Sequence, residues 1–372
     1  MAFYVQKVDN RVDLKTFVRL PYQLYCNDPF WVPPLISEEK KKIRVKTNPL
    51  LARCEAQLFI LYNNGAPVGR VSAFIDPLAV ENWKKPIGLF GSYECIDYDE
   101  GALLLLETAK QWLRERKMEI MRGPWSFTSQ EFGLVIKGFQ SVPMVMAPYN
   151  PPYYNRQMEN AGLRKAKDLM VYELDASQGY TLPDRFLKLT DRVAKKYGVH
   201  IRSINMKHID ADVQSIADIS NASTGENWGY VPVTDEEAQD IAASLKPVVD
   251  PDLVMIAEIN GKAVGYMIGL PDLNVILKDL KGRLFPFGIF KLMRDRKKIT
   301  RYRIWGLGIV PEYTRKAIDT LFYRRLYELL SPKNPTIVEA NYVLEDNMIM
   351  NNPILKMGFR VSKKYRVYEA EL

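Results

Sequence analysis

Arg315 and Lys316 stand in a short turn between an apolar run and an amphipathic stretch. The run 304–310 is rich in β-branched and aromatic residues and predicts a strand. The stretch that ends at Leu330 repeats its apolar residues at helical spacing and predicts a helix. The first amides of a helix have no partner within it and can bind a phosphate, which the two cations would also attract. The stretch therefore predicts an anion site, although an ordinary strand–helix connection has the same outline.

The sequence offers few of the residues that a metal site or a catalytic nucleophile needs. His200 and His208 are the only histidines, so neither a histidine metal site nor a Ser-His-Asp triad is expected. Cys26, Cys54 and Cys95 are odd in number and have no CxxC spacing. We expect reduced thiols in a cytoplasmic protein, and no bound metal.

The composition is that of a soluble globular protein. Of its 372 residues, 47% are hydrophobic and 26% charged, and this length favours two domains over one core. No apolar run is long enough to span a bilayer, and the first residues lack a signal-peptide pattern. The net charge of +8 favours an anionic partner, which could be a phosphate-bearing cofactor, a nucleic acid or a lipid surface.

The elements that position the cationic turn form a repeated pattern of strands and helices. In the first half the predicted strands are 3–8, 55–62, 67–75, 87–96, 118–123 and 165–174, and the predicted helices are 13–25, 101–116 and 151–161. Three short matches share one offset of 196 residues: 64–69 with 260–265, 162–164 with 358–360, and 171–173 with 367–369. We therefore predict a tandem duplication of one α/β unit, with domains at 1–177 and 178–372.

On these residues the chain resembles the GNAT superfamily, the Gcn5-related N-acyltransferases, most clearly in its second half. Members carry a turn of the form Q/R-x-x-G-x-G/A after an apolar strand, which aligns with residues 314–319, and Asn347 is spaced from Gly358-Phe359 as in the family. The resemblance implies an α/β fold with a mixed sheet, two tandem GNAT-like lobes, and a coenzyme A thioester (acetyl-CoA or a longer acyl-CoA) as co-substrate. The residues that it assigns to the cofactor are Leu307, Ile309, Val310, Thr314, Arg315, Lys316, Ala317, Ile318, Asp319 and Asn347.

Three positions depart from the family pattern. Ala317 and Asp319 stand where glycines would let the backbone approach the pyrophosphate, and a carboxylate at Asp319 would repel it. Ile354 stands where many members keep a tyrosine that protonates the departing thiolate. In the first half, residues 98–102 lack the motif, so we expect that half to be structural or to shape the acceptor site.

Acyl transfer also needs a base for the amine and a site for the acceptor. Glu339, Glu345 and Asp346 are the candidate bases, because they lie between a predicted core strand and the next helix; alternatively, Glu345 or Asp346 caps that helix, as Asn347 could too. Trp228 and Tyr230 belong to an aromatic loop where GNAT proteins commonly bind the acceptor. Clustered aromatic residues also serve simple packing.

Residues 271–300 are an insertion that combines many apolar side chains with a basic end at 294–298. Such a segment could lie on an anionic membrane, cover a long acyl chain, or pack as an arm between the two lobes. All three interpretations stay open at the level of sequence.

We therefore expect an enzyme that transfers an acyl group, long-chain or short, from a coenzyme A thioester to an amine in its second half. It would be cytoplasmic, with a peripheral position on the inner membrane as a further expectation. By analogy, bacterial ceramide synthesis uses a GNAT-like enzyme. The alternatives are a non-catalytic GNAT-fold binding protein and a Fem-like transferase that uses aminoacyl-tRNA, although no RNA-binding motif stands out.

Overall fold

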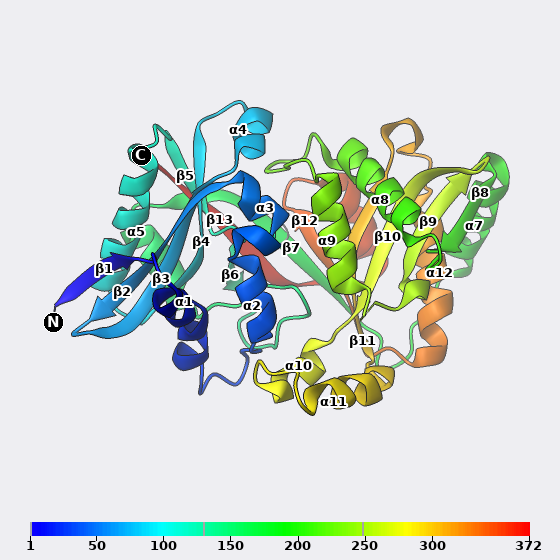
Figure 1. Ribbon diagram of the computed structural model, residues 1–372. Helices are drawn as coiled ribbons and strands as arrows, with labels where there is room; N and C mark the ends of the chain where they lie inside the picture. Colours follow the sequence, from blue (N-terminus) through cyan, green and yellow to red (C-terminus); the bar gives the residue numbers. More distant parts are fainter. Residues whose placement is uncertain (1, 129–130, 248) are drawn as a thin grey trace.

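The computed structural model describes residues 2–128, 131–247 and 249–372. One sheet runs through both the first half (1–177) and the second half (178–372), in the strand order β1-β2-β3-β4-β5-β13-β7-β12-β11-β10-β9-β8, with β6 beside β13 (Figure 1). The strands are β1 (Phe3–Lys7), β2 (Glu55–Asn63), β3 (Ala66–Ile75), β4 (Ile87–Cys95), β5 (Ile120–Gly123), β6 (Leu134–Lys137), β7 (Arg164–Asp175), β8 (Val199–Ser203), β9 (Val254–Ile259), β10 (Lys262–Pro271), β11 (Arg301–Ile309), β12 (Ile337–Leu344) and β13 (Arg360–Glu371). The helices are α1 (Arg11–Leu24), α2 (Ile36–Lys42), α3 (Pro49–Arg53), α4 (Pro77–Trp83), α5 (Asp99–Arg114), α6 (Tyr153–Asn160), α7 (Asp184–Tyr197), α8 (Ile209–Thr224), α9 (Asp235–Leu245), α10 (Asn274–Leu280), α11 (Gly288–Asp295), α12 (Asp319–Leu330) and α13 (Met348–Lys356).

The predicted duplication is visible in the placement of the elements. Strands β3 and β10 begin 196 residues apart (262−66), and so do β7 and β13 (360−164). The hairpins β2–β3 and β9–β10 both turn at Asn-Gly, and Asn64 and Asn260 have φ values of 49° and 51°. Asn and Gly adopt positive φ readily, so the same turn chemistry builds the same hairpin twice.

The two halves exchange their last strands. Strand β13, from the second half, pairs antiparallel with β5 of the first half, and β7, from the first half, pairs antiparallel with β12 of the second. Strands β7 and β13 pair with each other at the centre of the sheet. Both ends of the chain therefore lie at the same side of the molecule (Figure 1). The limits 1–177 and 178–372 divide the chain by sequence, whereas each half completes its sheet with a strand from the other.

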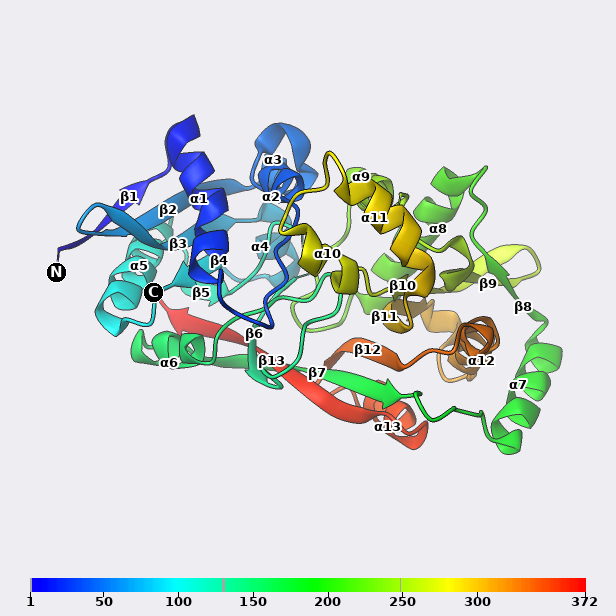
Figure 2. The same ribbon diagram turned by 90° about the horizontal axis from the view of Figure 1, so that it is seen from below.

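Helices cover both faces of the sheet. Figure 2 shows α5, α6, α7, α12 and α13 on one side and α1, α2, α3, α8, α9, α10 and α11 on the other. The largest apolar core joins α12 to the sheet of the second half, where Phe322 is fully buried. A matching core joins α5 to the sheet of the first half through Leu105 and Leu106. Within the described residues, no helix is long and apolar enough to cross a membrane.

Candidate functional site

Strands β11 and β12 run parallel over one short ladder and then separate. The ladder ends at the pair Ile304–Ala340. Beyond this pair the described pairing of β11 is with β10, and that of β12 is with β7. Trp305 is an extra residue in β11, opposite the step from Ile268 to Gly269 in β10, and it forms a bulge where the strands part. The divergence leaves the β12 side of β11 without a described strand partner from Trp305 onward.

Three residues assigned to the cofactor follow the bulge. Leu307 and Ile309 lie on the open stretch of β11, and their side chains pack against the core beneath α12. The Val310 amide donates to the carbonyl of Val264 at 3.0 Å and ends the pairing with β10. The backbone of 305–309 is therefore held from one side only.

An apolar cavity of about 390 Å³ opens beside this divergence, between α8, α9 and the sheet. Trp305, Gly306 and Tyr342 line it at the diverging strands, and Trp228 and Tyr230, the predicted acceptor residues, line it from the loop between the two helices. The structure thus brings the predicted acceptor loop and the end of the parallel ladder into one cavity.

The first half holds the acceptor loop in place. Asn82 Nδ2 and Trp83 Nε1 of α4 each donate to the Tyr230 carbonyl at 2.8 Å. The Arg122 guanidinium of β5 lies 4.8 Å from the centre of the Trp228 ring, a cation–π distance. Both contacts reach from the first half into the cavity of the second, so the first half shapes this site.

A buried polar network lies at the inner end of the cavity. Arg303 is 1% exposed; its Nε donates to Asn341 Oδ1 at 2.6 Å, and its Nη1 donates to the Val145 carbonyl. Asn341 Nδ2 in turn donates to Glu339 Oε1 at 2.8 Å. Arg303 Nη2 and the Tyr342 hydroxyl have no hydrogen-bond partner among the described residues. Because both residues line the cavity, these free donors suit an oxygen atom of a ligand.

Glu339 differs from the other two candidate bases. It is 2% exposed, and burial raises the pKa of its carboxyl, an effect that the Arg303 and Lys363 charges oppose. Its Oε1 lies 3.8 Å from Arg303 Nε. Glu339 does not itself line the cavity; it is linked through Asn341 to Arg303, which does. A carboxyl with a raised pKa in such a network is suited to proton transfer.

Glu345 and Asp346 lie in surface ion pairs instead. Glu345 accepts from Lys165 Nζ at 2.7 Å and from the Asp168 amide at 3.1 Å. Asp346 is 64% exposed and accepts from Lys167 Nζ at 2.8 Å, a hydrogen bond that lowers its pKa. Neither residue lines the apolar cavity. Their contacts fasten the end of β12 to β7.

The cationic turn keeps an unusual backbone without glycine. Arg315 and Ala317 have φ values of 61° and 57°, in the left-handed region that glycine favours. Thr314 Oγ1 donates to the Pro311 carbonyl at 2.8 Å, and Lys316 Nζ lies 4.2 Å from the centre of the Tyr313 ring. Arg315 is exposed. The turn therefore presents one exposed cation and one cation held over an aromatic ring.

The amides at the start of α12 already have partners. The Thr320 amide donates to the Ala317 carbonyl at 3.2 Å, and the Leu321 amide donates to the Ile318 carbonyl at 3.0 Å. Burial raises the pKa of the Asp319 carboxyl, an effect that the nearby Asp319 and Thr320 amides oppose. A pyrophosphate at this helix start would have to compete with these carbonyls and would meet the Asp319 carboxylate.

Two further motif positions have structural roles. Asn347 caps α13, because its side chain accepts from the Met350 amide at 3.3 Å. Ile354 is 3% exposed and belongs to the core beneath α12. The side chain that replaces the family's tyrosine is therefore a packing residue.

The corresponding opening in the first half is filled by the chain itself. There β4 and β5 pair only from Ile87–Ile120 to Leu89–Arg122. The Trp125 amide then donates to the Phe90 carbonyl at 2.7 Å, and a Cβ on Gly91 would lie 1.8 Å from the Trp125 carbonyl oxygen. The chain itself thus closes the gap at Gly91, and a cavity of about 360 Å³ remains farther along β4, lined by Ser92, Tyr93 and Glu94.

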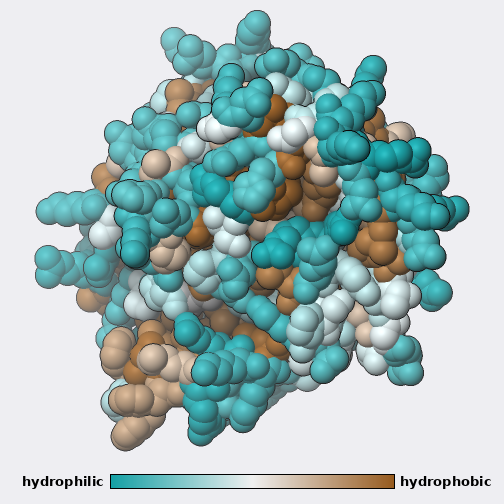
Figure 3. All heavy atoms as spheres, turned by 90° about the vertical axis from the view of Figure 1, so that its right-hand side faces the viewer, coloured by the Kyte–Doolittle hydropathy of each residue, from teal (hydrophilic) through white to brown (hydrophobic). Residues whose placement is uncertain are grey.

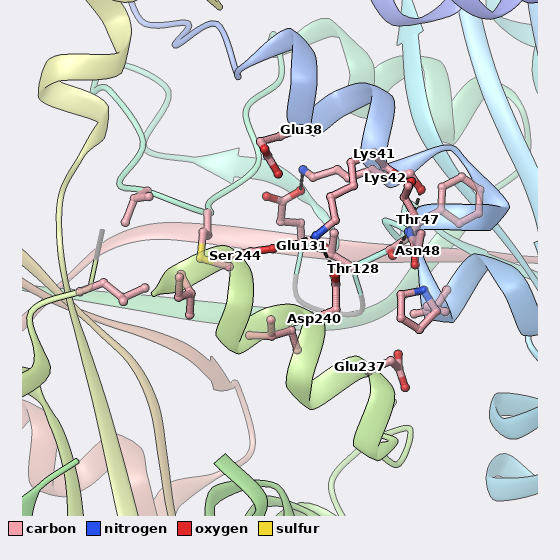
Figure 4. A pocket seen from close by; sticks show the side chains of 18 of the residues that line it. Glu38, Lys41, Lys42, Thr47, Asn48, Thr128, Glu131, Glu237, Asp240 and Ser244 are labelled. Carbon is pink, nitrogen blue, oxygen red and sulfur yellow. Dashed lines mark hydrogen bonds and ion pairs between the residues drawn. The ribbon is translucent and has the colours of Figure 1, made fainter. Parts of the chain in front are cut away.

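A second cavity of about 270 Å³ lies where the halves meet, between α2, α3 and α9 (Figure 4). Two ion pairs cross the junction: Lys41 Nζ lies 2.6 Å from Asp240 Oδ1, and Arg53 Nη1 lies 2.6 Å from Glu237 Oε2. A third pair, Lys42 Nζ with Glu131 Oε2 at 3.0 Å, lies within the first half. The first two pairs join the halves beside the apolar cavity.

The sequence did not single out Arg303, Asn341 or Tyr342 as site residues. Arg303 stands in an otherwise apolar and aromatic strand, Tyr302 to Ile309, and such an isolated charge was the available signal. Within the described residues, no group of three or more His, Cys, Asp or Glu side chains is arranged to hold a metal.

No protein-family model matches the sequence. Protein YghO of Escherichia coli (strain K12) is 34% identical over 370 residues, covering 98% of this chain and 94% of that protein. The Bacterial ceramide synthase of Caulobacter vibrioides is 32% identical over 373 residues, covering 98% of this chain and 96% of that protein.

Solved structures with the same fold are tandem or GCN5-related acetyltransferases. A tandem GNAT protein from the clavulanic acid biosynthesis pathway matches with a TM-score of 0.58 and 12% identity, covering 100% of this chain and 98% of that one. A GCN5-related N-acetyltransferase from Sphaerobacter thermophilus matches with a TM-score of 0.54 and 13% identity, covering 99% and 95%. These likenesses confirm the predicted fold of two tandem GNAT-like lobes. The chain belongs to the family of its two sequence relatives, Protein YghO and the Bacterial ceramide synthase, and has the tandem GNAT fold.

Proposed function

We propose that this protein transfers an acyl group from a coenzyme A thioester to an amine where β11 and β12 diverge. One observation carries the proposal: the divergence opens onto an apolar cavity whose inner end presents two buried, unpartnered donors, Arg303 Nη2 and Tyr342 Oη. In the reaction the amine nitrogen bonds to the acyl carbon, the carbon–sulfur bond breaks, the amine loses a proton and the sulfur gains one. The two free donors would bind the carbonyl oxygen while it carries negative charge.

The remaining roles follow from position. The open edge at Leu307 and Ile309, with Val310 after it, would hold the thioester arm. The turn from Thr314 to Asp319, with the charges of Arg315 and Lys316, would hold the phosphates. Asn347, which caps α13, is kept as a cofactor residue on the family resemblance alone. Of the three predicted bases we favour Glu339, because Glu345 and Asp346 are fixed in surface pairs.

The cavity supports an apolar substrate. A pocket of this size that is lined mainly by aromatic and aliphatic side chains would accept a hydrocarbon chain rather than a polar peptide. The name of the Caulobacter relative, Bacterial ceramide synthase, points the same way. We therefore propose a lipid-like amine or a long-chain acyl group as the substrate part that enters the cavity, in a cytoplasmic protein that lies against the inner membrane.

A non-catalytic binding protein is the second candidate, and Asp319 is the observation that favours it. Its carboxylate lies beside the Asp319 and Thr320 amides, where it would repel a pyrophosphate. If Asp319 blocks the cofactor, the cavity could still bind an apolar ligand without chemistry.

Two measurements test the proposal. Thermal unfolding is followed with coenzyme A, acetyl-CoA and palmitoyl-CoA, since a ligand at a hundred times its Kd adds about 2.7 kcal/mol of stability. Release of free thiol is then followed with palmitoyl-CoA and a long-chain amino alcohol. We expect stabilisation by palmitoyl-CoA that the Arg315→Asn/Lys316→Gln variant reduces, because Asn tolerates the positive φ at 315 while both charges are lost. Binding without thiol release would favour the second candidate, and no stabilisation by any of the three would refute acyl-CoA dependence.

A further inference from the structure

The inner side of the insertion 271–300 is firmly packed. Leu273, Ile276, Leu292 and Ile299 form a buried apolar cluster of their own. Arg301 Nε lies 2.9 Å from Asp272 Oδ2, and Asp272 is fully buried. Helices α10 and α11 are therefore a folded unit, not a loose loop.

The turn between these helices is also docked on the first half. The Ile36 amide donates to the Gly282 carbonyl at 3.0 Å, and Lys278 Nζ donates to the Pro29 carbonyl. Gly282 has a φ of +77°, and a Cβ there would lie 2.7 Å from Tyr22 Cε1 and 2.9 Å from the Pro34 carbonyl oxygen. Part of the insertion thus acts as a packing arm between the halves, which holds its outer side in a fixed orientation.

The outer side exposes large apolar side chains that contact no core. Phe285, Phe287, Phe290 and Met293 are 75%, 79%, 69% and 60% exposed. Phe287, Phe290 and Met293 recur every third residue along α11, so they form one stripe. Figure 3 shows apolar side chains gathered on a protruding lower corner of the molecule. None of these four side chains lines a cavity described above.

Positive charge surrounds this stripe. Residues 271–300 hold eight Lys or Arg and three Asp, a net charge of +5 (8−3) out of +8 for the whole chain. Two of the three acids are on the surface of the insertion, and both are neutralised: Asp279 by Lys291, and Asp295 by Arg294 and Lys298. The exposed cations are Lys281, Arg283, Arg294, Arg296, Lys297 and Lys298.

We propose that the α10–α11 unit docks the protein on an anionic lipid bilayer. The phenylalanines would enter the interface between headgroups and acyl chains, and the cations would contact lipid phosphates. A second copy of the chain is a poorer occupant, because two surfaces of charge +5 would repel each other. The inference adds to the proposed function the orientation in which the protein meets a membrane, and the docking itself does not depend on acyl transfer.

Vesicle sedimentation tests the docking with the full-length protein. Vesicles of phosphatidylcholine alone and of phosphatidylcholine with about 30% phosphatidylglycerol are compared at low and high salt. We expect binding to the anionic vesicles, with a partition coefficient that falls about tenfold or more in Phe285→Ser/Phe287→Ser/Phe290→Ser. The matched control is Leu103→Ser/Leu104→Ser on α5, which also removes exposed apolar side chains and should leave the partition coefficient unchanged.

A charge variant tests the second part of the inference. Arg296→Glu/Lys297→Glu/Lys298→Glu should lose binding to anionic vesicles, whereas Lys195→Glu/Lys196→Glu at the end of α7 should bind as the wild type does. Equal binding to both vesicle types would overturn the anionic preference. No vesicle binding, or a dimer in sedimentation that the phenylalanine variant abolishes, would overturn membrane docking. Thiol release from acetyl-CoA in vesicle-free buffer reports on the proposed function separately, because neither variant touches the divergence of β11 and β12.

Discussion

Arg303 of β11 and Glu339 of β12 face each other across the parallel ladder, one row before the two strands separate, with Nε and Oε1 3.8 Å apart. Both are almost fully buried, and Asn341 bridges them with hydrogen bonds to each. Buried ion pairs add little net stability, whereas the loss of one partner leaves the other charge uncompensated. A substitution at either residue should therefore change both the stability of the sheet and the proposed site.

Glu339→Ala should lower the free energy of unfolding by about 3–5 kcal/mol, since it leaves the buried Arg303 charge without its partner. Urea unfolding of the variant and the wild type measures this. Glu345→Ala is the control; it removes the surface pair with Lys165 and the hydrogen bond from the Asp168 amide, and should destabilise by no more than about 2 kcal/mol. Equal effects of the two substitutions would contradict a buried pair at 303 and 339.

Glu339→Gln separates chemistry from packing. The amide keeps an oxygen for Asn341 but takes no proton, so the rate of thiol release should fall by about 100-fold or more while the folded state survives. A variant with wild-type kcat would remove Glu339 as the base. Tyr342→Phe should lower kcat with little effect on KM, because the lost donor would act mainly on the reacting carbonyl.

Asp319 should make stability depend on pH. At low pH the carboxyl is protonated in both states. As the pH rises, the unfolded chain ionises first, because burial raises the pKa in the folded state; the free energy of unfolding therefore falls until the pH passes that raised pKa. Asp319→Asn should lack this fall, which urea unfolding between about pH 3.5 and 8 would show as a growing difference from the wild type. If the wild type instead gains stability relative to Asp319→Asn as the pH rises, the ionised carboxylate is favoured as a helix cap.

The cavity can be narrowed from α9. Ala242 lines it, whereas the neighbouring Ala243 is exposed and lies outside its walls. Ala242→Trp should lower turnover of palmitoyl-CoA or of a long-chain amine at least tenfold relative to short-chain substrates, and Ala243→Trp should change neither. Equal losses for all chain lengths would argue against this cavity as the chain-binding site.

Two corresponding glycines should respond differently to the same substitution. Gly91 pairs with Ser72, and Gly306 pairs with Ile268. Ile268 follows Ser72 by the 196 residues of the repeat (268−72), so the two glycines occupy corresponding positions. Gly91→Ala forces a Cβ to within 1.8 Å of a backbone oxygen and should destabilise by about 3 kcal/mol or more. Gly306→Ala brings its Cβ to 3.2 Å from the Tyr266 ring and 3.9 Å from Ile268 Cδ1, both side-chain atoms, and should be milder by at least about 1 kcal/mol. Thermal unfolding of both variants checks whether the first opening is filled and the second is free.

Local chemistry made much of the fold predictable. The Asn-Gly turns, the alternating strands and the helices with one apolar face all depend on residues that are near each other in sequence, and the structure has them. The short helices α3 and α4 and the pairing of β13 with β5 escaped prediction. Strand partners are chosen by packing between distant segments, and the repeat alone does not say on which side of the sheet each copy places its last strand.

The site was less predictable for a similar reason. Trp228 and Tyr230 lie in one cavity with the diverging strands, at the loop where the family resemblance puts the acceptor. Their binding of the acceptor stays a prediction. Glu345 and Asp346 looked equivalent to Glu339 in sequence, yet their partners Lys165 and Lys167 come from the other half of the chain. Only the exchanged strand β7 brings those lysines next to β12.

The exchange of β7 and β13 also constrains the order in which the two halves can fold during synthesis. Strand β5 gains its second neighbour only from β13. The sheet of the first half can therefore be completed only after the whole second half has been synthesised. Until then the open edges of β5 and β7 are exposed to pairing with other nascent chains. Expression of either half alone should therefore yield an aggregation-prone fragment. Co-expression of the two fragments should restore folded protein, because β7 and β13 can again pair with strands of the other half.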